Sequence, residues 1–236
     1  MGDVLEQTQS WWDSLARTAT IESQTSLWLV AAGLLIGVLL ASKPAYRLTR
    51  HIVTFTHEGG HAFVGLVTGR KLAGIKLHTD SSGVTTTVGP PGLKRVPTSF
   101  AGYPAPAITA GLLLMAVLSG NSVIAVTIAA ALTAVLLAFT RNVWGFIVTL
   151  LILVGFIALL RWLPVGLVPL FVSAAAGLLA VGALRDLFNE RRARSKSMTD
   201  VRSIGIALNV PAWFVWLVML FVILVGLIFP PALVVI

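Results

Sequence analysis

Seven apolar segments constrain what this chain can fold into more than any other feature. With 57% hydrophobic and only 11% charged residues, the 236-residue chain has the composition of a polytopic membrane protein. A helix that crosses the hydrocarbon core needs roughly 20 mainly apolar residues. We therefore predict an all-α polytopic membrane protein with about seven transmembrane helices, which cover approximately residues 26–41, 51–69, 97–119, 122–139, 143–160, 165–187 and 209–229.

The chain divides into two parts by composition. Residues 1–25 are polar and acidic, carry the pair Trp11-Trp12 and lack the pattern of a cleavable signal peptide. Paired Trp beside a membrane suggests an interfacial segment, although a mobile tail would explain the same residues. We predict that residues 26–236 form a single membrane-embedded domain.

The second apolar segment contains the motif His57-Glu58-Gly59-Gly60-His61, which reads HExxH. On a helix, residues four apart share one face, so both imidazoles can reach one metal ion. A catalytic zinc normally has three protein ligands and one water, and Glu58 can serve as the general base for that water. Polar groups in a membrane helix cost at least about 2.5 kcal/mol and are usually functional. We predict a Zn²⁺ site rather than a structural polar cluster.

A stretch of different character follows this helix. Residues 71–78 and 84–88 alternate between apolar and polar side chains, and residues 79–83 between them have turn chemistry. We predict a short β-hairpin directly after the HExxH helix. Gly59 and Gly60 would allow another helix or a substrate backbone to approach closely.

The charge distribution predicts the orientation. If the N-terminus is cytoplasmic and every segment crosses, 13 of the 17 Lys and Arg residues lie inside. This agrees with the positive-inside rule. The net charge of +8 is then explained by membrane orientation, and we expect no nucleic-acid partner. The chain has no cysteine, which excludes thiol ligands and cysteine nucleophiles.

The third metal ligand is sought by elimination among few residues. Asp186 closes the sixth apolar segment on the predicted inner side, and we favour it over Asp200, which precedes the last segment. An ion pair with Arg185 or the basic loop would explain Asp186 without a metal, and a helix cap would explain Asp200. To reach His57, the helix with Asp186 would have to extend beyond the bilayer or tilt. The remaining candidates are Asp80, Glu190, His51 and His78. A polar turn is the ordinary explanation for His78 and Asp80, and His51 lies about two helical turns before His57, too far to share its ion.

HEGGH in a membrane helix, a following hairpin, a next span broken at Gly102-Tyr103-Pro104 and a late aspartate together resemble the site-2 protease clan. Within it, the chain is most similar to the compact M50B-like membrane proteins common in actinobacteria, over about residues 50–220. The resemblance implies an intramembrane zinc endopeptidase in a bacterial plasma membrane that cuts transmembrane protein substrates. It implies His57, His61 and Asp186 as ligands and Glu58 as base, although Asp186 is followed by Leu187 where the clan usually has Gly.

Two other classes of function can be compared with this interpretation. A non-proteolytic metal-binding scaffold or transporter would fit the absence of a recognition domain, but would not need a carboxylate beside the two imidazoles. A serine-type membrane protease is excluded, because the chain contains no Gly-x-Ser-x-Gly sequence. The substrate is expected to be a transmembrane protein, and the oligomeric state stays open.

Overall fold

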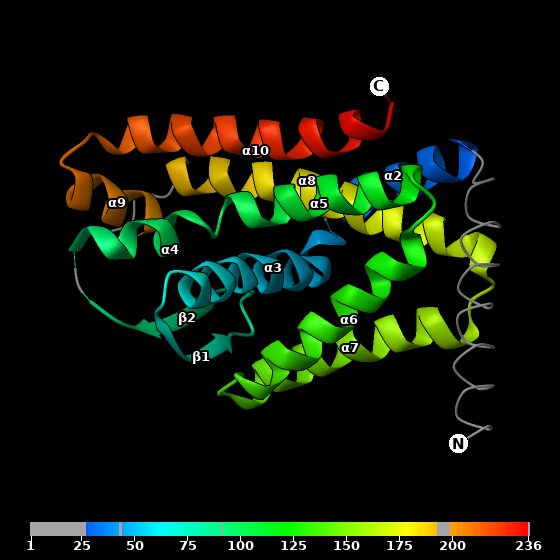
Figure 1. The fold of residues 1–236 in the computed structure, drawn as a ribbon, viewed down its shortest axis with the longest axis horizontal. Coiled ribbons are helices and arrows are strands. Elements are labelled where there is room, and N and C mark those ends of the chain that lie inside the picture. Colours follow the sequence, from blue (N-terminus) through cyan, green and yellow to red (C-terminus); the bar gives the residue numbers. More distant parts are fainter. Residues whose placement is uncertain (1–26, 43, 91, 193–198, 236) are drawn as a thin grey trace, which may run out of the picture.

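The computed structural model describes residues 27–42, 44–90, 92–192 and 199–235 and is mostly helical, with one small sheet (Figure 1). The predicted interfacial segment 1–25 lies outside these residues. The elements in chain order are α2 (Leu27–Leu40), α3 (Tyr46–Val67), β1 (Lys71–Leu77), β2 (Gly83–Val88), η1 (Gly92–Arg95), α4 (Val96–Phe100), α5 (Pro104–Leu118), α6 (Ser122–Ala138), α7 (Val143–Trp162), η2 (Val165–Leu167), α8 (Val168–Arg192), α9 (Asp200–Leu208) and α10 (Ala212–Val235).

Three helical segments of the described chain are long and apolar enough to cross a membrane: Val143–Trp162, Val165–Glu190 and Ala212–Val234. A fourth results if Gly92–Phe100 and Pro104–Leu118, which are bent by 46° relative to each other, form one broken span. Helices α2 and α6 are apolar but shorter. These helices support a membrane protein with several spans, and the total of seven stays a prediction.

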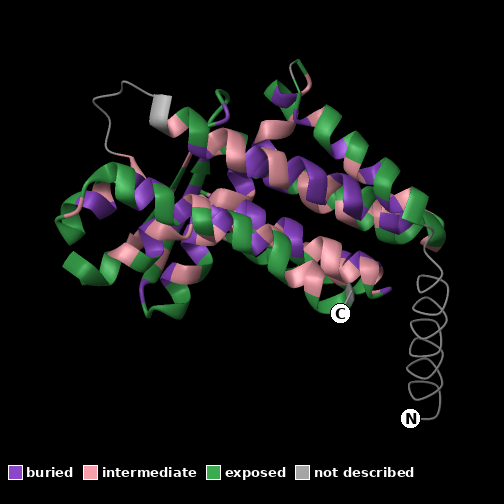
Figure 2. Cartoon of the chain, turned by 90° about the horizontal axis from the view of Figure 1, so that it is seen from above, coloured by how far each residue is buried: buried purple, intermediate pink, exposed green. Residues whose placement is uncertain are grey.

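Helix α3 occupies the middle of the molecule. In Figure 1 it lies between the layer formed by α5, α8 and α10 and the small β-sheet, while the α6–α7 pair runs obliquely below it. Buried residues lie where the helices face each other, and the outer faces carry exposed residues (Figure 2). Many of these exposed residues are large and apolar, for example Leu151 on α7 and Phe221 on α10. An apolar exterior of this extent is suited to contact with lipid rather than water.

Glycines bring the helices of the main layer into close contact. A Cβ atom at Gly37 of α2 would collide with the carbonyl oxygen of Ala174 in α8, and one at Gly111 of α5 would collide with the carbonyl oxygen of Gly226 in α10. Lipid gives apolar helices little reason to associate, so membrane helices gain their packing energy from such close backbone approach. The layer that supports α3 is therefore held by small residues.

The two strands form an antiparallel hairpin beside α3. The register runs from Lys71 opposite Val88 to Leu77 opposite Gly83, with an irregularity between Leu72 and Gly74. Ile75 and Leu77 are buried in an apolar cluster that also contains residues of α3 and α7. The hairpin is thus fixed against α3 by one face of β1.

The corner between α6 and α7 covers the outer edge of β1. The amide of Ile75 donates to the carbonyl of Phe139, and the amide of Arg141 donates to the carbonyl of Ile75, both at 2.9 Å. The side-chain amide of Asn142 completes this edge, because it donates to the Leu77 carbonyl at 2.6 Å and accepts from the Leu77 amide at 3.2 Å. The other edge of β2 has no backbone–backbone hydrogen bond to a further element among the described residues.

Candidate metal centre

The two histidines of the HExxH motif lie one turn apart on α3 and face the same point. Their Nε2 atoms are 3.1 Å apart, and the ring centroids are 4.8 Å apart at an interplanar angle of 81°. Both residues lie in the long α3 helix, whose spacing of 3.6 residues per turn places positions 57 and 61 above each other. The sequence spacing alone therefore produces half of the cluster.

Asp200 supplies the third polar group of the cluster. Its Oδ2 atom lies 3.4 Å from Nε2 of His57 and 3.2 Å from Nε2 of His61. Burial alone would raise the pKa of this carboxyl group, but hydrogen bonding to the two imidazoles holds its pKa well below the ordinary value. Within the described residues, His57, His61 and Asp200 are the group that could hold a metal ion.

Asp200 is the first residue of the short helix α9, and several contacts fix that helix. Thr199 is its N-cap: the hydroxyl accepts from the Arg202 amide at 3.3 Å and donates to the Glu190 carboxylate of α8 at 2.8 Å. Val201 and Ile204 are buried in the apolar cluster shared with α8 and α10. Asp200 is therefore held at the histidines by an anchored helix rather than by a loop.

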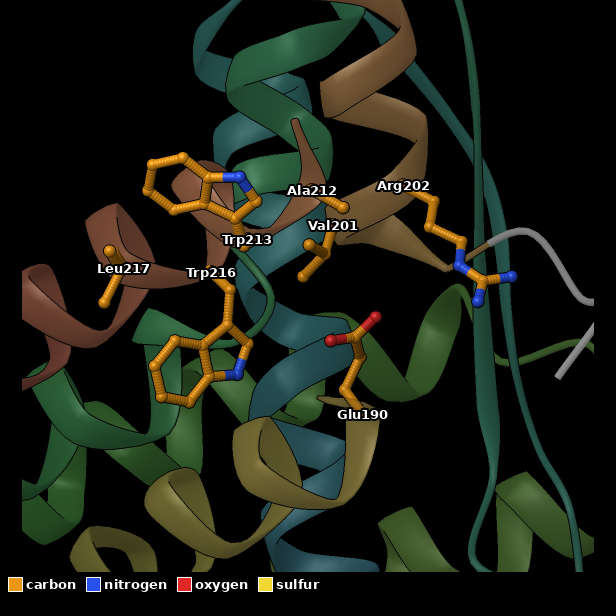
Figure 3. A pocket seen from close by; sticks show the side chains of 7 residues that line it. All are labelled: Glu190, Val201, Arg202, Ala212, Trp213, Trp216 and Leu217. Atoms are coloured by element: carbon orange, nitrogen blue, oxygen red, sulfur yellow. The ribbon is translucent and has the colours of Figure 1, made fainter. Parts of the chain in front are cut away.

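A pocket of about 350 Å³ lies on another side of α9, between the end of α8 and the start of α10 (Figure 3). Figure 3 shows two indole rings on one side of it and a guanidinium group on the other. The pocket does not include the two histidines or Asp200. Its lining residues are Glu190, Val201, Arg202, Ala212, Trp213, Trp216 and Leu217.

Asp186, the residue favoured from the sequence as third ligand, lies away from the two histidines. Asp186 Oδ1 accepts from Arg50 Nε at 3.3 Å and from the Tyr46 hydroxyl at 3.2 Å. Both partners lie in the first turns of α3, so Asp186 faces a level about two turns before His57. An ion pair was the ordinary explanation for this aspartate, and the cation is Arg50, which the sequence did not single out. Asp200 takes the place beside the histidines.

His61 is oriented by the backbone of the neighbouring helix α4. Its Nδ1 atom lies 2.7 Å from the carbonyl oxygen of Thr98, which can only accept a hydrogen bond. Nδ1 therefore carries the proton, and the lone pair of Nε2 is left for a metal ion. A carbonyl or carboxylate on the second nitrogen is the usual companion of a metal-binding histidine.

The side chain of Glu58 extends from α3 toward the start of β2, and the residue is only 4% exposed. Its Oε2 atom accepts from the Thr85 hydroxyl at 2.6 Å, whereas Oε1 has no hydrogen-bond partner among the described residues. A Cβ atom at Gly83 would lie 2.7 Å from both Cγ and Oε1 of Glu58, so any other residue there would displace the Glu58 carboxylate. The hairpin thereby sets the position of the carboxylate.

Gly102, in the break between α4 and α5, leaves space next to the ligand atoms. A Cβ atom at this position would lie 2.5 Å from Nε2 of both His57 and His61. Gly60 lets the same break approach α3, because a Cβ there would collide with Ala105 and lie 2.8 Å from the Ala101 carbonyl oxygen. Two imidazole nitrogens, one carboxylate oxygen and free space beside them fit a catalytic metal site with three protein ligands.

Three of the remaining ligand candidates lie together near the hairpin turn, whereas Glu190 lies at the end of α8 beside α9. His51 Nε2 is 3.3 Å from the Ser81 hydroxyl, and His78 Nδ1 is 3.1 Å from the Ser82 hydroxyl. Asp80 accepts from the Ser82 amide at 2.9 Å, as expected for a polar turn. None of these residues belongs to the cluster around His57.

Sequence reasoning did not anticipate the groups that surround the ligands. The Thr98 carbonyl carries no sequence signal, because every residue has one. The Thr85 hydroxyl could have been suspected, since it lies on the hairpin face that points toward α3. Gly102 was visible in the sequence as part of Gly102-Tyr103-Pro104. Its role beside the ligand nitrogens could not be predicted, because that role requires the break between α4 and α5 to lie next to His57.

The fold and the cluster together define a helical membrane protein with a candidate metal centre of two histidines and one aspartate. Comparison with protein families matches residues 30–230 to the family described as Peptidase M50B-like. The chain belongs to this family, which is the site-2 protease family, and membership implies an intramembrane metalloprotease. The comparison with curated proteins and the comparison with solved structures each found no match.

Proposed function

We propose that the protein is a zinc endopeptidase that cuts membrane-protein substrates within the bilayer. The observation that carries this proposal is the meeting of His57, His61 and Asp200 from two distant helices, with Glu58 one residue from the first ligand. Family membership supports the same class of enzyme. The three residues would hold the zinc ion, which when bound acts as a Lewis acid and lowers the pKa of water.

Glu58 is the proposed general base. Because Thr85 occupies Oε2, the unpartnered Oε1 is free to accept the proton of the attacking water and to pass it to the leaving amine. The short hydrogen bond from Thr85 keeps the carboxylate from rotating, and the surrounding α3 and β2 residues keep it buried. His61 needs no change of tautomer during this step, since Thr98 already fixes its proton on Nδ1.

The outer edge of β2 is the proposed binding edge for the substrate. Its opposite edge is paired with β1, whose own outer edge is covered by the α6–α7 corner. A transmembrane segment that unwinds near the site can pair with β2 as an added strand, which satisfies its backbone groups in an apolar environment. Thr85 links this strand to Glu58, so a peptide on β2 would lie near the base.

The test compares the full-length wild type with Glu58→Gln, each co-expressed with a tagged library of single-span membrane reporters. Gln keeps the shape of Glu58 but cannot accept the proton, so cleavage should fall by a factor of about 10²–10⁴ while zinc content stays equal. Glu22→Gln, in the N-terminal segment outside the described residues, is the matched control and should cleave normally. Equal cleavage by Glu58→Gln and wild type would leave a metal-binding scaffold or transporter as the better reading.

A further inference from the structure

The two histidines of the centre are held in unequal ways. His61 has the Thr98 carbonyl on Nδ1, and its side chain is 10% exposed. His57 has no hydrogen bond to Nδ1 from any described residue, and its side chain is 18% exposed. An imidazole without a partner on its second nitrogen can rotate about its side-chain bonds, which weakens its use as a ligand. Another contact must therefore fix the His57 ring.

Tyr103 makes that contact. Its ring centroid lies 4.8 Å from the centroid of the His57 ring, and the two planes meet at 89°. This edge-to-face arrangement is the favoured geometry for aromatic pairs. The ring of His61 lies at the same centroid distance from the His57 ring. The His57 imidazole thus contacts two aromatic rings, His61 and Tyr103, and Tyr103 is the one that is not a proposed ligand.

The position of Tyr103 in the chain makes it a firm support. It follows Gly102 in the break between α4 and α5 and precedes Pro104, whose ring restricts the backbone at the start of α5. It also packs against the buried apolar cluster that contains Val201 of α9. The same short segment therefore gives space to the ligand nitrogens through Gly102 and contacts His57 through the next side chain.

We infer that Tyr103 is a positioning residue for the metal centre, whose aromatic ring holds the His57 imidazole in the orientation needed for zinc binding. This inference rests on the zinc site proposed above. The ring, not the hydroxyl, carries the effect, because the hydroxyl has no hydrogen-bond partner among the described residues. Loss of an outer partner of a ligating histidine weakens metal binding by roughly 10–100-fold. We expect a loss near the lower end of this range, about tenfold, because the contact is not a hydrogen bond.

The experiment measures zinc affinity of the purified full-length protein by competition with a chelator. Tyr103→Leu removes the aromatic ring but still fills the apolar cluster, and Tyr103→Met is a second variant of the same kind. Tyr103→Phe keeps the ring. The chain has one other tyrosine, Tyr46, which is 5% exposed and lies away from the cluster, so Tyr46→Leu is the matched control for loss of a buried tyrosine. Helical circular dichroism reports whether each variant folds.

Tyr103→Leu and Tyr103→Met should bind zinc about tenfold more weakly, while Tyr103→Phe and Tyr46→Leu should match the wild type. The visible absorption spectrum of the Co²⁺-loaded protein should change only in the first two variants, because a rotated imidazole alters the ligand geometry. Unchanged affinity and spectrum in both ring-deleted variants would overturn the inference. A loss in Tyr103→Phe as large as in Tyr103→Leu would also overturn it. A wild type that binds no zinc would overturn the proposed function itself.

Discussion

Replacing each of the two candidate aspartates separately tests the third ligand most directly. Asp200→Asn keeps the size of the side chain and removes the negative charge next to His57 and His61. Asp186→Asn makes the same chemical change at the residue that accepts from Arg50 and Tyr46. The two variants therefore differ only in where the charge is lost, and each serves as the control for the other.

The expected magnitudes follow from the contacts. Oδ2 of Asp200 lies 3.2 Å and 3.4 Å from the two imidazole nitrogens, so its loss removes a direct ligand from the cluster. Removing a residue that hydrogen-bonds to a metal ligand weakens metal binding by up to about 100-fold, and removing a ligand itself should weaken it at least as much. We expect zinc binding at least about 100-fold weaker for Asp200→Asn, which corresponds to about 2.8 kcal/mol. Cleavage should fall together with zinc content.

Asp186→Asn should leave zinc content and affinity unchanged. Its amide oxygen can still accept from Arg50 and Tyr46. The side chain of Arg50 is 38% exposed and that of Asp186 is 14% exposed, so loss of the ion pair should cost about 1 kcal/mol. The small cost should be visible as a slightly lower Tm and nowhere else.

The assay is zinc content by elemental analysis, followed by affinity from chelator competition, on protein purified without added metal. If Asp186→Asn lost the metal and Asp200→Asn retained it, the arrangement of α9 beside α3 would be refuted. Equal zinc content in both variants and the wild type would show that the two histidines bind the ion without either aspartate.

Three further predictions concern other parts of the molecule. Gly102→Ala should lose zinc because its Cβ would lie 2.5 Å from the ligand nitrogens, whereas Gly155→Ala, with no atom within 4 Å, should bind normally; elemental analysis checks both. Thr85→Val should keep zinc but cleave roughly tenfold or more slowly, since the charged Glu58 carboxylate loses the hydrogen bond from the Thr85 hydroxyl. Thr86→Val, on the exposed face of β2, is the control and should cleave like wild type. A topology reporter fused in the 190–200 loop should register as cytoplasmic and one at the C-terminus as external, and the opposite labelling would contradict the charge count.

Short-range patterns in the sequence predicted what depends on neighbouring residues. The spacing of His57 and His61 requires only a helix, and the helix is present. The break in the following segment was predicted from Gly102 and Pro104, and the structure ends α4 at Phe100 and begins α5 at Pro104. Gly60 was expected to allow close approach, and the break of α4–α5 does approach it.

The third carboxylate could not be predicted in this way, because it depends on how distant elements meet. Asp186 was favoured because it closes the sixth apolar segment on the predicted inner side, where the second half of the HExxH helix was also expected. Which aspartate lies beside the histidines depends on where α9 packs. This short helix contacts α4 and thereby brings Asp200 next to His57 and His61. The Thr199 cap at the start of α9 was a readable signal, but it predicts where a helix starts and not what the helix faces.

The distance in sequence between the ligands has a consequence for biogenesis. Asp200 lies 139 positions after His61 in the sequence. A chain that has been synthesised and inserted as far as α8 already contains both histidines and Glu58, but it lacks the carboxylate that completes the cluster. The centre can assemble only after the chain has been synthesised as far as α9. Because of this order of the helices, an incompletely synthesised chain in the membrane has no complete metal site.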